Sequence, residues 1–166
     1  MYRIKDFFYK TVYDIKGKQL GSVRDICIDF YKGKVNGFLI GGEIFKSKKN
    51  YIPVDSVINV DDDILVESCI HGEGLNISDI LGMEVIDRCG TIKGVVEDIL
   101  ISEDDYYIKG IIISAGIIDK LIYGREVILI NKSVLGEDYI LYLGDPNLIV
   151  KNIPHEMNRN EYYKKA

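Results

Sequence analysis

The chain has 166 residues and a formal charge of −5, from 21 Lys and Arg against 26 Asp and Glu. It contains 28 Ile and 13 Val but only 2 Ala and no Trp. Because β-branched residues suit strands and Ala suits helices, this composition excludes a helical bundle. No uncharged apolar run approaches the ~20 residues of a membrane span, and the first residues lack the apolar core of a signal peptide. We therefore expect a β-rich, cytoplasmic protein.

The sequence repeats itself. Residues 4–40 align without a gap on residues 77–113, with 12 identities in 37 positions. After a difference in loop length, Ile64-Leu65 aligns with Ile140-Leu141. This register predicts a tandem duplication, with a first domain at 1–70, a second at 75–145 and a C-terminal tail at 146–166.

Each repeat is expected to open with a helical turn, at 4–8 and at 77–81. Ser78 stands where its hydroxyl would cap the second turn. These turns are short, so they do not alter the β-rich assignment.

A hairpin turn follows in both copies. Asp14 and Gly17 have the spacing of a turn in which Asp accepts backbone hydrogen bonds and Gly takes a positive φ. Asp87 and Gly90 repeat it. Both aspartates are thereby explained as backbone-bonding residues rather than as a catalytic acid and base.

The next strand changes parity at Asp25. Val23 and Asp25 share one face by alternation, yet Ile26 begins an apolar series on the other face. The same change occurs at Asp98. A β-bulge would return the aliphatic residues to the core in both repeats, and it would leave the two aspartates as backbone-bonding residues.

Further short strands are expected at 34–42, 50–60 and 63–68, and at 107–114, 125–131 and 138–143. Five to six short strands in about 65 residues make a small, strongly bent sheet that closes on itself. The predicted fold is all-β: two small barrels in tandem, with short helical turns and a C-terminal tail.

The repeated pattern apolar-x-Asp-x-x-Gly-x-x-x-Gly-x-Val-x-Asp-Ile resembles the PRC-barrel family. The resemblance covers roughly 3–68 and 76–144. Leu81-Gly82 also fits the family, whereas the first repeat has Phe8-Tyr9 instead, so the entry turns are expected to differ.

The resemblance implies a non-enzymatic interaction domain. Relatives include the cytoplasmic domain of the photosynthetic reaction-centre H subunit and the C-terminal domain of a ribosome maturation factor that contacts a ribosomal protein. Small proteins of spore-forming bacteria linked to sporulation also belong to the family. The family has no general catalytic motif to transfer, so no catalytic or cofactor-binding residue is assigned.

Residues with metal or redox chemistry are sparse. Cys27 falls inside a strand and is expected to be buried, whereas Cys89 lies in the second hairpin turn and is expected to be exposed. Cys69 and His71 offer only two ligands, where a structural zinc site needs four. We expect no metal, no cofactor and no small-molecule substrate.

The repeats differ most in one loop, and partner binding is therefore assigned there. The first repeat has a basic loop with Lys46, Lys48 and Lys49. The second has an apolar loop at 116–124, which either covers a barrel end or forms an exposed contact surface. Its candidate binding residues are Ile117, Ile118, Leu121, Ile122 and Tyr123.

The two halves of the chain also differ in net charge. Residues 1–70 hold 11 basic and 10 acidic side chains, and residues 71–166 hold 10 and 16, giving +1 and −6. An acidic second half is poorly suited to nonspecific phosphate binding. The expected function is that of an adaptor that binds a protein partner or self-associates. The alternative is a ribosome- or RNA-associated maturation factor that uses the basic loop.

Overall fold

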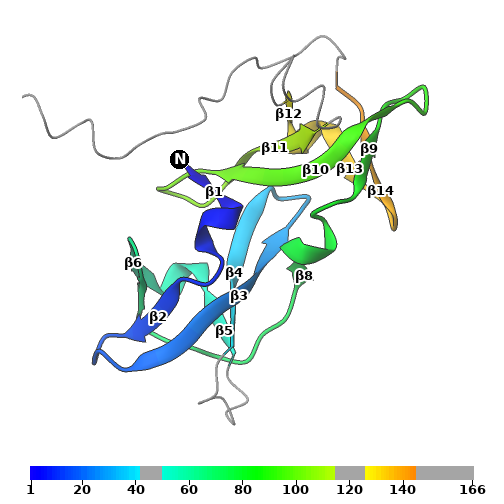
Figure 1. The fold of residues 1–166 in the computed structure, drawn as a ribbon. Coiled ribbons are helices and arrows are strands. Elements are labelled where there is room, and N and C mark those ends of the chain that lie inside the picture. The colour runs from blue at the N-terminus through cyan, green and yellow to red at the C-terminus, as the bar shows by residue number, and fades with distance from the viewer. Residues whose placement is uncertain (42–49, 115–125, 145–166) are drawn as a thin grey trace, which may run out of the picture.

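The computed structural model describes residues 1–41, 50–114 and 126–144. They form two seven-stranded β-sheets joined by 3-10 turns, one sheet for each repeat (Figure 1). No helix within these ranges is long and apolar enough to cross a membrane.

The first sheet has the order β5-β4-β3-β2-β7-β6. Neighbouring strands are antiparallel except for the parallel pair β2 and β7. Its own strands are β2 (Thr11–Asp14), β3 (Gln19–Asp29), β4 (Lys34–Gly41), β5 (Tyr51–Pro53), β6 (Val57–Val60) and β7 (Ile64–Val66).

The second sheet repeats this order as β12-β11-β10-β9-β14-β13, with β14 parallel to β9. Its own strands are β9 (Glu84–Ile86), β10 (Ile92–Ile101), β11 (Ile108–Ser114), β12 (Glu126–Ile128), β13 (Ser133–Leu135) and β14 (Tyr139–Tyr142).

In the described residues, four 3-10 turns lie between the strands. The first turn, η1 (Ile4–Phe7), and the third, η3 (Ile77–Asp79), occupy the two predicted helical positions. Between strands lie η2 (Val54–Ser56) and η4 (Ile130–Lys132). The turn η2 divides the strand predicted at 50–60 into β5 and β6. The turn η4 ends the strand predicted at 125–131 and leads into β13, which was not predicted.

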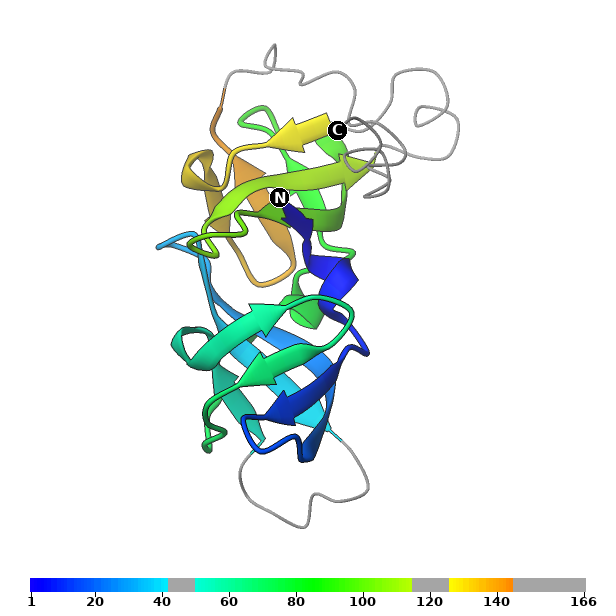
Figure 2. The same ribbon diagram turned by 90° about the vertical axis from the view of Figure 1, so that its left-hand side faces the viewer.

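The seventh strand of each sheet comes from the other repeat. β1 (Tyr2–Arg3) pairs with the end of β10, and β8 (Leu75–Asn76) pairs with the end of β3. Figure 2 shows the N-terminal segment lying against the second sheet. A shift of 73 residues converts one pairing into the other: Tyr2 faces Ile101, as Leu75 faces Ile28. The two repeats are therefore joined by a reciprocal exchange of strands about a pseudo-two-fold axis.

The expected closed barrels of five to six strands need correction. Each repeat does supply six strands, but the exchange adds a seventh. The hydrogen-bonded order of each sheet ends at separate edge strands, β5 and β6 in one and β12 and β13 in the other, with no pairing between them in the described part of the chain. The sheets are bent and open rather than closed.

The predicted parity change is confirmed. The register between β3 and β4 shifts between Val23 and Asp25, and that between β10 and β11 shifts between Val96 and Asp98. Such a bulge inserts one extra residue and turns the following side chains to the opposite face. Val23 and Ile26, on either side of the bulge, are both fully buried as a result.

One hydrophobic core runs through both repeats. Phe7 from η1 stacks on Phe38 of β4 with 5.2 Å between ring centroids, and Tyr2 meets Phe7 edge-on at 5.2 Å. Phe38 in turn contacts Tyr106 of the second repeat at 6.4 Å. Aromatic packing therefore continues across the boundary between the repeats.

Candidate functional site

The most constrained polar group is Asp98, at the bulge of β10. Its carboxylate accepts hydrogen bonds from the backbone N–H of Ile99 at 2.9 Å and of Lys5 at 3.2 Å. Arg3 Nε donates to the other oxygen at 3.1 Å. Only 2% of Asp98 is exposed, and burial raises the pKa of its carboxyl, with the two N–H groups and the cation of Arg3 acting in the opposite direction.

Asp25, at the bulge of β3 in the first repeat, makes the equivalent contact with the second repeat. Its carboxylate accepts from its neighbour Ile26 at 2.8 Å and from the backbone N–H of Ser78 at 3.2 Å. The Ser78 hydroxyl also donates to Asp25. Ser78 makes no cap with its own turn, so the predicted capping role is wrong: its hydroxyl bonds to the other repeat instead.

A third contact lies on the pseudo-two-fold axis. Lys34 and Tyr107, which are equivalent positions, form an antiparallel bridge with each other. The flanking hydrogen bonds are also symmetric, from Val35 N–H to Tyr106 O at 3.0 Å and from Ile108 N–H to Gly33 O at 2.7 Å. Together with the Asp98 and Asp25 contacts, this bridge forms what we call the inter-repeat clasp.

The hairpin aspartates have the predicted structural role. Asp14 accepts from the N–H groups of Lys16 and Lys18 at 2.8 and 2.9 Å. Asp87 accepts from Thr91 at 2.9 Å and Cys89 at 2.8 Å, and these bonds hold its pKa below the ordinary value. Both carboxylates are therefore engaged by backbone N–H groups of their own turns.

The predicted partner-binding side chains lie outside the described residues. Lys46, Lys48 and Lys49 fall within 42–49, and the apolar candidates fall within 115–125. In the described part of the chain, β4 and β5 flank residues 42–49, and β11 and β12 flank residues 115–125. The flanking strands are equivalent in the two repeats, and the binding role of the two segments stays a prediction.

Thiol environments follow the predicted pattern. Cys27 is 1% exposed, and its Sγ lies 3.6 Å from Asn76 Oδ1. Burial, with a further contribution from Asp25, raises the pKa of Cys27 to about 11. Cys89 is exposed. Within residues 1–41, 50–114 and 126–144, no group of three or more His, Cys, Asp or Glu side chains could hold a metal ion.

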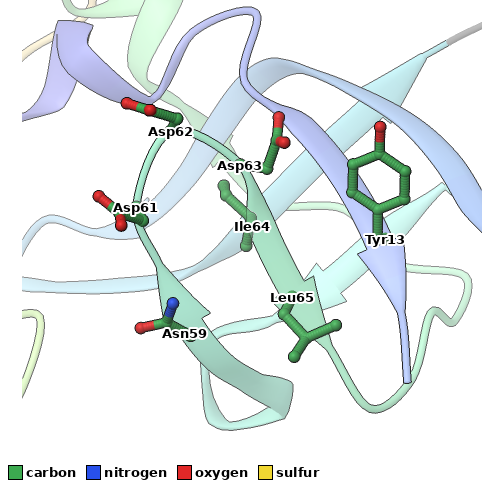
Figure 3. Close-up of a pocket in the computed structure, with 7 residues that line it drawn as sticks. All are labelled: Tyr13, Asn59, Asp61, Asp62, Asp63, Ile64 and Leu65. Carbon is green, nitrogen blue, oxygen red and sulfur yellow. The ribbon is translucent and has the colours of Figure 1, made fainter. Parts of the chain in front are cut away.

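A pocket of about 420 Å³ lies on the outer face of the first sheet, at the β6–β7 turn (Figure 3). The carboxylates of Asp61 and Asp62 point away from the Tyr13 ring, so the three acids of this turn do not converge. Lys10 Nζ donates to the backbone oxygens of Asp61 and Asp62, which ties the turn to the start of β2. The lining residues are Tyr13, Asn59, Asp61, Asp62, Asp63, Ile64 and Leu65.

The same place on the second sheet is aliphatic. Ile92 faces Ile86, Ile86 faces Leu141, and Leu141 faces Val134, so the four side chains cross β10, β9, β14 and β13 in one line. Ile92 is 59% exposed and Val134 40%. We call these four residues the aliphatic row. In the first repeat the corresponding line reads Gln19, Tyr13, Leu65 and Asn59.

The sequence alone did not identify the aliphatic row, because its four residues are brought into one line only by the strand register. The available signal was a difference between the repeats: Ile92 aligns with Gln19, and Ile86 aligns with Tyr13. An aliphatic residue that replaces a polar one at an outward position is not needed by the shared scaffold.

These features define a duplicated β-sheet protein whose two halves share a core and whose outer faces differ. The sequence matches the PRC-barrel domain twice, over residues 1–68 and 72–141, and the chain belongs to that family. A search of curated proteins found no match. PRC-barrel domains serve as protein-interaction modules.

Proposed function

We propose that this protein is a non-enzymatic adaptor, in which two PRC-barrel repeats form one scaffold that binds a protein partner or self-associates. The observation that carries the proposal is the inter-repeat clasp. Each repeat completes the other's sheet and supplies hydrogen-bond donors to the other's bulge aspartate. The two outer faces are thereby held in one orientation and can be presented together.

The distribution of polar groups supports a scaffold rather than an enzyme. Asp98, the buried acid, is directed at backbone N–H groups and Arg3 inside the clasp. Asp14 and Asp87 are engaged in their own turns. A general base needs reach to a substrate proton, and these carboxylates are occupied by the fold itself.

The test combines affinity capture with light scattering. The tagged full chain serves as bait in extracts of the source cells, including sporulating cells if the source forms spores, and the tag alone serves as the control. We expect a reproducible protein partner or a defined oligomer. A monomer that captures no partner would overturn the proposal.

A ribosome-associated role is the alternative, and it depends on Lys46, Lys48 and Lys49. Co-sedimentation with ribosomal particles at low salt, lost in a Lys48→Glu, Lys49→Glu variant, would favour it. Because phosphate contacts weaken with salt, the association should also decline as salt rises. We place the protein in the cytoplasm, which cell fractionation tests directly.

A further inference from the structure

We propose that the aliphatic row on the second sheet is the docking surface for a protein segment whose aliphatic side chains are flanked by Lys or Arg. This inference rests on the proposed adaptor function and names the chemistry of its partner. It concerns described residues only, and it is independent of the two loops that the sequence singled out.

The dimensions of the row fit an extended segment. Adjacent strands are about 4.8 Å apart, so a line across four strands spans roughly 14 Å. An extended chain places side chains of one face ~6.8 Å apart, so three alternate residues cover that length. Val95 and Tyr139, 40% and 44% exposed, lie beside the row and widen it. Exposed aliphatic groups gathered in this way mark an interaction site.

The charge beside the aliphatic row indicates the charge of its partner. Glu84 is exposed and lies between Val95 and Tyr139 in the strand register. Glu137 and Asp138 are exposed in the adjoining β13–β14 turn. Residues 71–166 carry 16 acidic side chains against 10 basic ones. Complementarity therefore favours a partner with a basic side chain over this side of the row.

Basic groups lie on the opposite side of the row from Glu84. Arg88, in the β9–β10 turn, donates to the backbone oxygen of Leu143, and Lys132 directly precedes β13. The acidic side chains therefore flank one side of the row, and a segment that lies along the row would place its basic side chains on that side.

A second copy of the chain is the competing occupant. A two-fold contact that brings the Glu84 sides of two copies together is opposed by like charges, whereas one that sets Glu84 of one copy over Arg88 of the other is not. Light scattering of the wild type and the triple variant therefore distinguishes a second copy from a basic partner segment.

The first repeat provides a matched control. A variant carrying Ile92→Gln, Val134→Asn and Glu84→Thr installs the residues that stand at equivalent places in the first sheet, namely Gln19, Asn59 and Thr11. All three positions are exposed, so the variant should fold. The reverse pair, Gln19→Ile with Asn59→Val, extends an aliphatic line on the first sheet.

The probe is a phage-displayed library of random dodecapeptides, selected on the full-length protein and counter-selected on the triple variant. We expect enriched peptides that combine Ile, Val or Leu with Lys or Arg, and whose dissociation constant rises at least tenfold on the triple variant. Charge reversal of their basic residues should have a similar effect.

Three outcomes would overturn the inference. Enriched peptides could be acidic, they could bind the triple variant equally well, or light scattering could show a dimer that the triple variant abolishes. The failure is separable from that of the adaptor proposal: a captured cellular partner that binds wild type and triple variant alike leaves the adaptor standing and removes only the aliphatic row.

Discussion

Arg3 Nε, at the start of the first repeat, donates a hydrogen bond of 3.1 Å to the buried carboxylate of Asp98 in the second. The backbone N–H of Lys5 reaches the same carboxylate. Asp98→Ala would leave these donors without their acceptor. Because hydrogen bonds to charged groups contribute about 1.5–3 kcal/mol each and two are lost between the repeats, we expect a loss of at least about 3 kcal/mol in the free energy of unfolding by urea.

Asp25→Ala is the matched control for this substitution. Asp25 makes the equivalent backbone contact with Ser78, but it is only partly buried, so water can replace the lost acceptor. We expect a loss of about 1 kcal/mol. Equal losses for the two variants would show that burial of the Asp98 contact adds nothing.

The pH dependence of stability gives a second test of Asp98. Burial raises its folded-state pKa above the ordinary 3.8, so the folded state binds this proton more tightly than the unfolded state does. Its contribution is therefore greatest below pH 3.8 and is lost as the pH rises through the folded pKa. The stability difference between wild type and Asp98→Asn should grow in favour of wild type as the pH falls from 7 to 4. A constant or shrinking difference in urea unfolding would contradict this.

The clasp also shows where sequence reasoning ends. The bulge at Asp25 and Asp98 was predictable, because parity in the strand changes there whatever the surroundings. The partner of each carboxylate was not. A local pattern places Ser78 beside its own turn, and only the arrangement of the two repeats shows that its hydroxyl bonds to Asp25.

Tyr9 is a second position whose local structure the local sequence did not predict. The pair Phe8-Tyr9 suggested an entry turn unlike that at Leu81-Gly82, yet Tyr9 and Gly82 have φ of 66° and 88°. Their N–H groups make equivalent 2.9 Å bonds, to Val23 O and Val96 O. The expected difference is wrong, because the hydrogen bonds of the repeat impose the left-handed conformation on either residue.

Tyr9→Gly should consequently stabilise the protein. Tyr9 is 74% exposed, so little packing is lost. Relief of a left-handed conformation is worth about 1–2 kcal/mol, from which the greater freedom of unfolded Gly subtracts about 0.4–1 kcal/mol. We expect a net gain of about 0.5–1 kcal/mol in thermal or urea unfolding. Gly82→Ala, where space is open, should lose about 1 kcal/mol from φ alone. Destabilisation by Tyr9→Gly would refute this account.

Gly37 and Gly110 are equivalent residues that differ in how well they would tolerate a side chain. A Cβ on Gly37 would lie 2.3 Å from the backbone oxygen of Ile52, whereas one on Gly110 would first meet the Val127 side chain at 2.4 Å. A side chain can move more readily than a sheet backbone. Gly37→Ala should thus cost at least 2–3 kcal/mol, the upper range of overpacking, and Gly110→Ala should cost less. Urea unfolding of the two variants measures the order, and the reverse order would count against the close backbone approach.

Cys27 and Cys89 differ in reactivity for a physical reason that mass spectrometry can follow. Cys27 is 1% exposed with a pKa of about 11, whereas Cys89 is exposed. The thiolate is the nucleophile, so a rise of two pKa units lowers the thiolate population of Cys27 ~100-fold. Burial of the sulfur lowers its reactivity further. Iodoacetamide at pH 8 should modify native Cys89 and leave Cys27 unmodified until urea is added. Cys89→Ser should remove the fast label without exposing Cys27. Modification of both thiols at similar rates in the native protein would mean that β3 opens readily and that the strand exchange with β8 does not hold it.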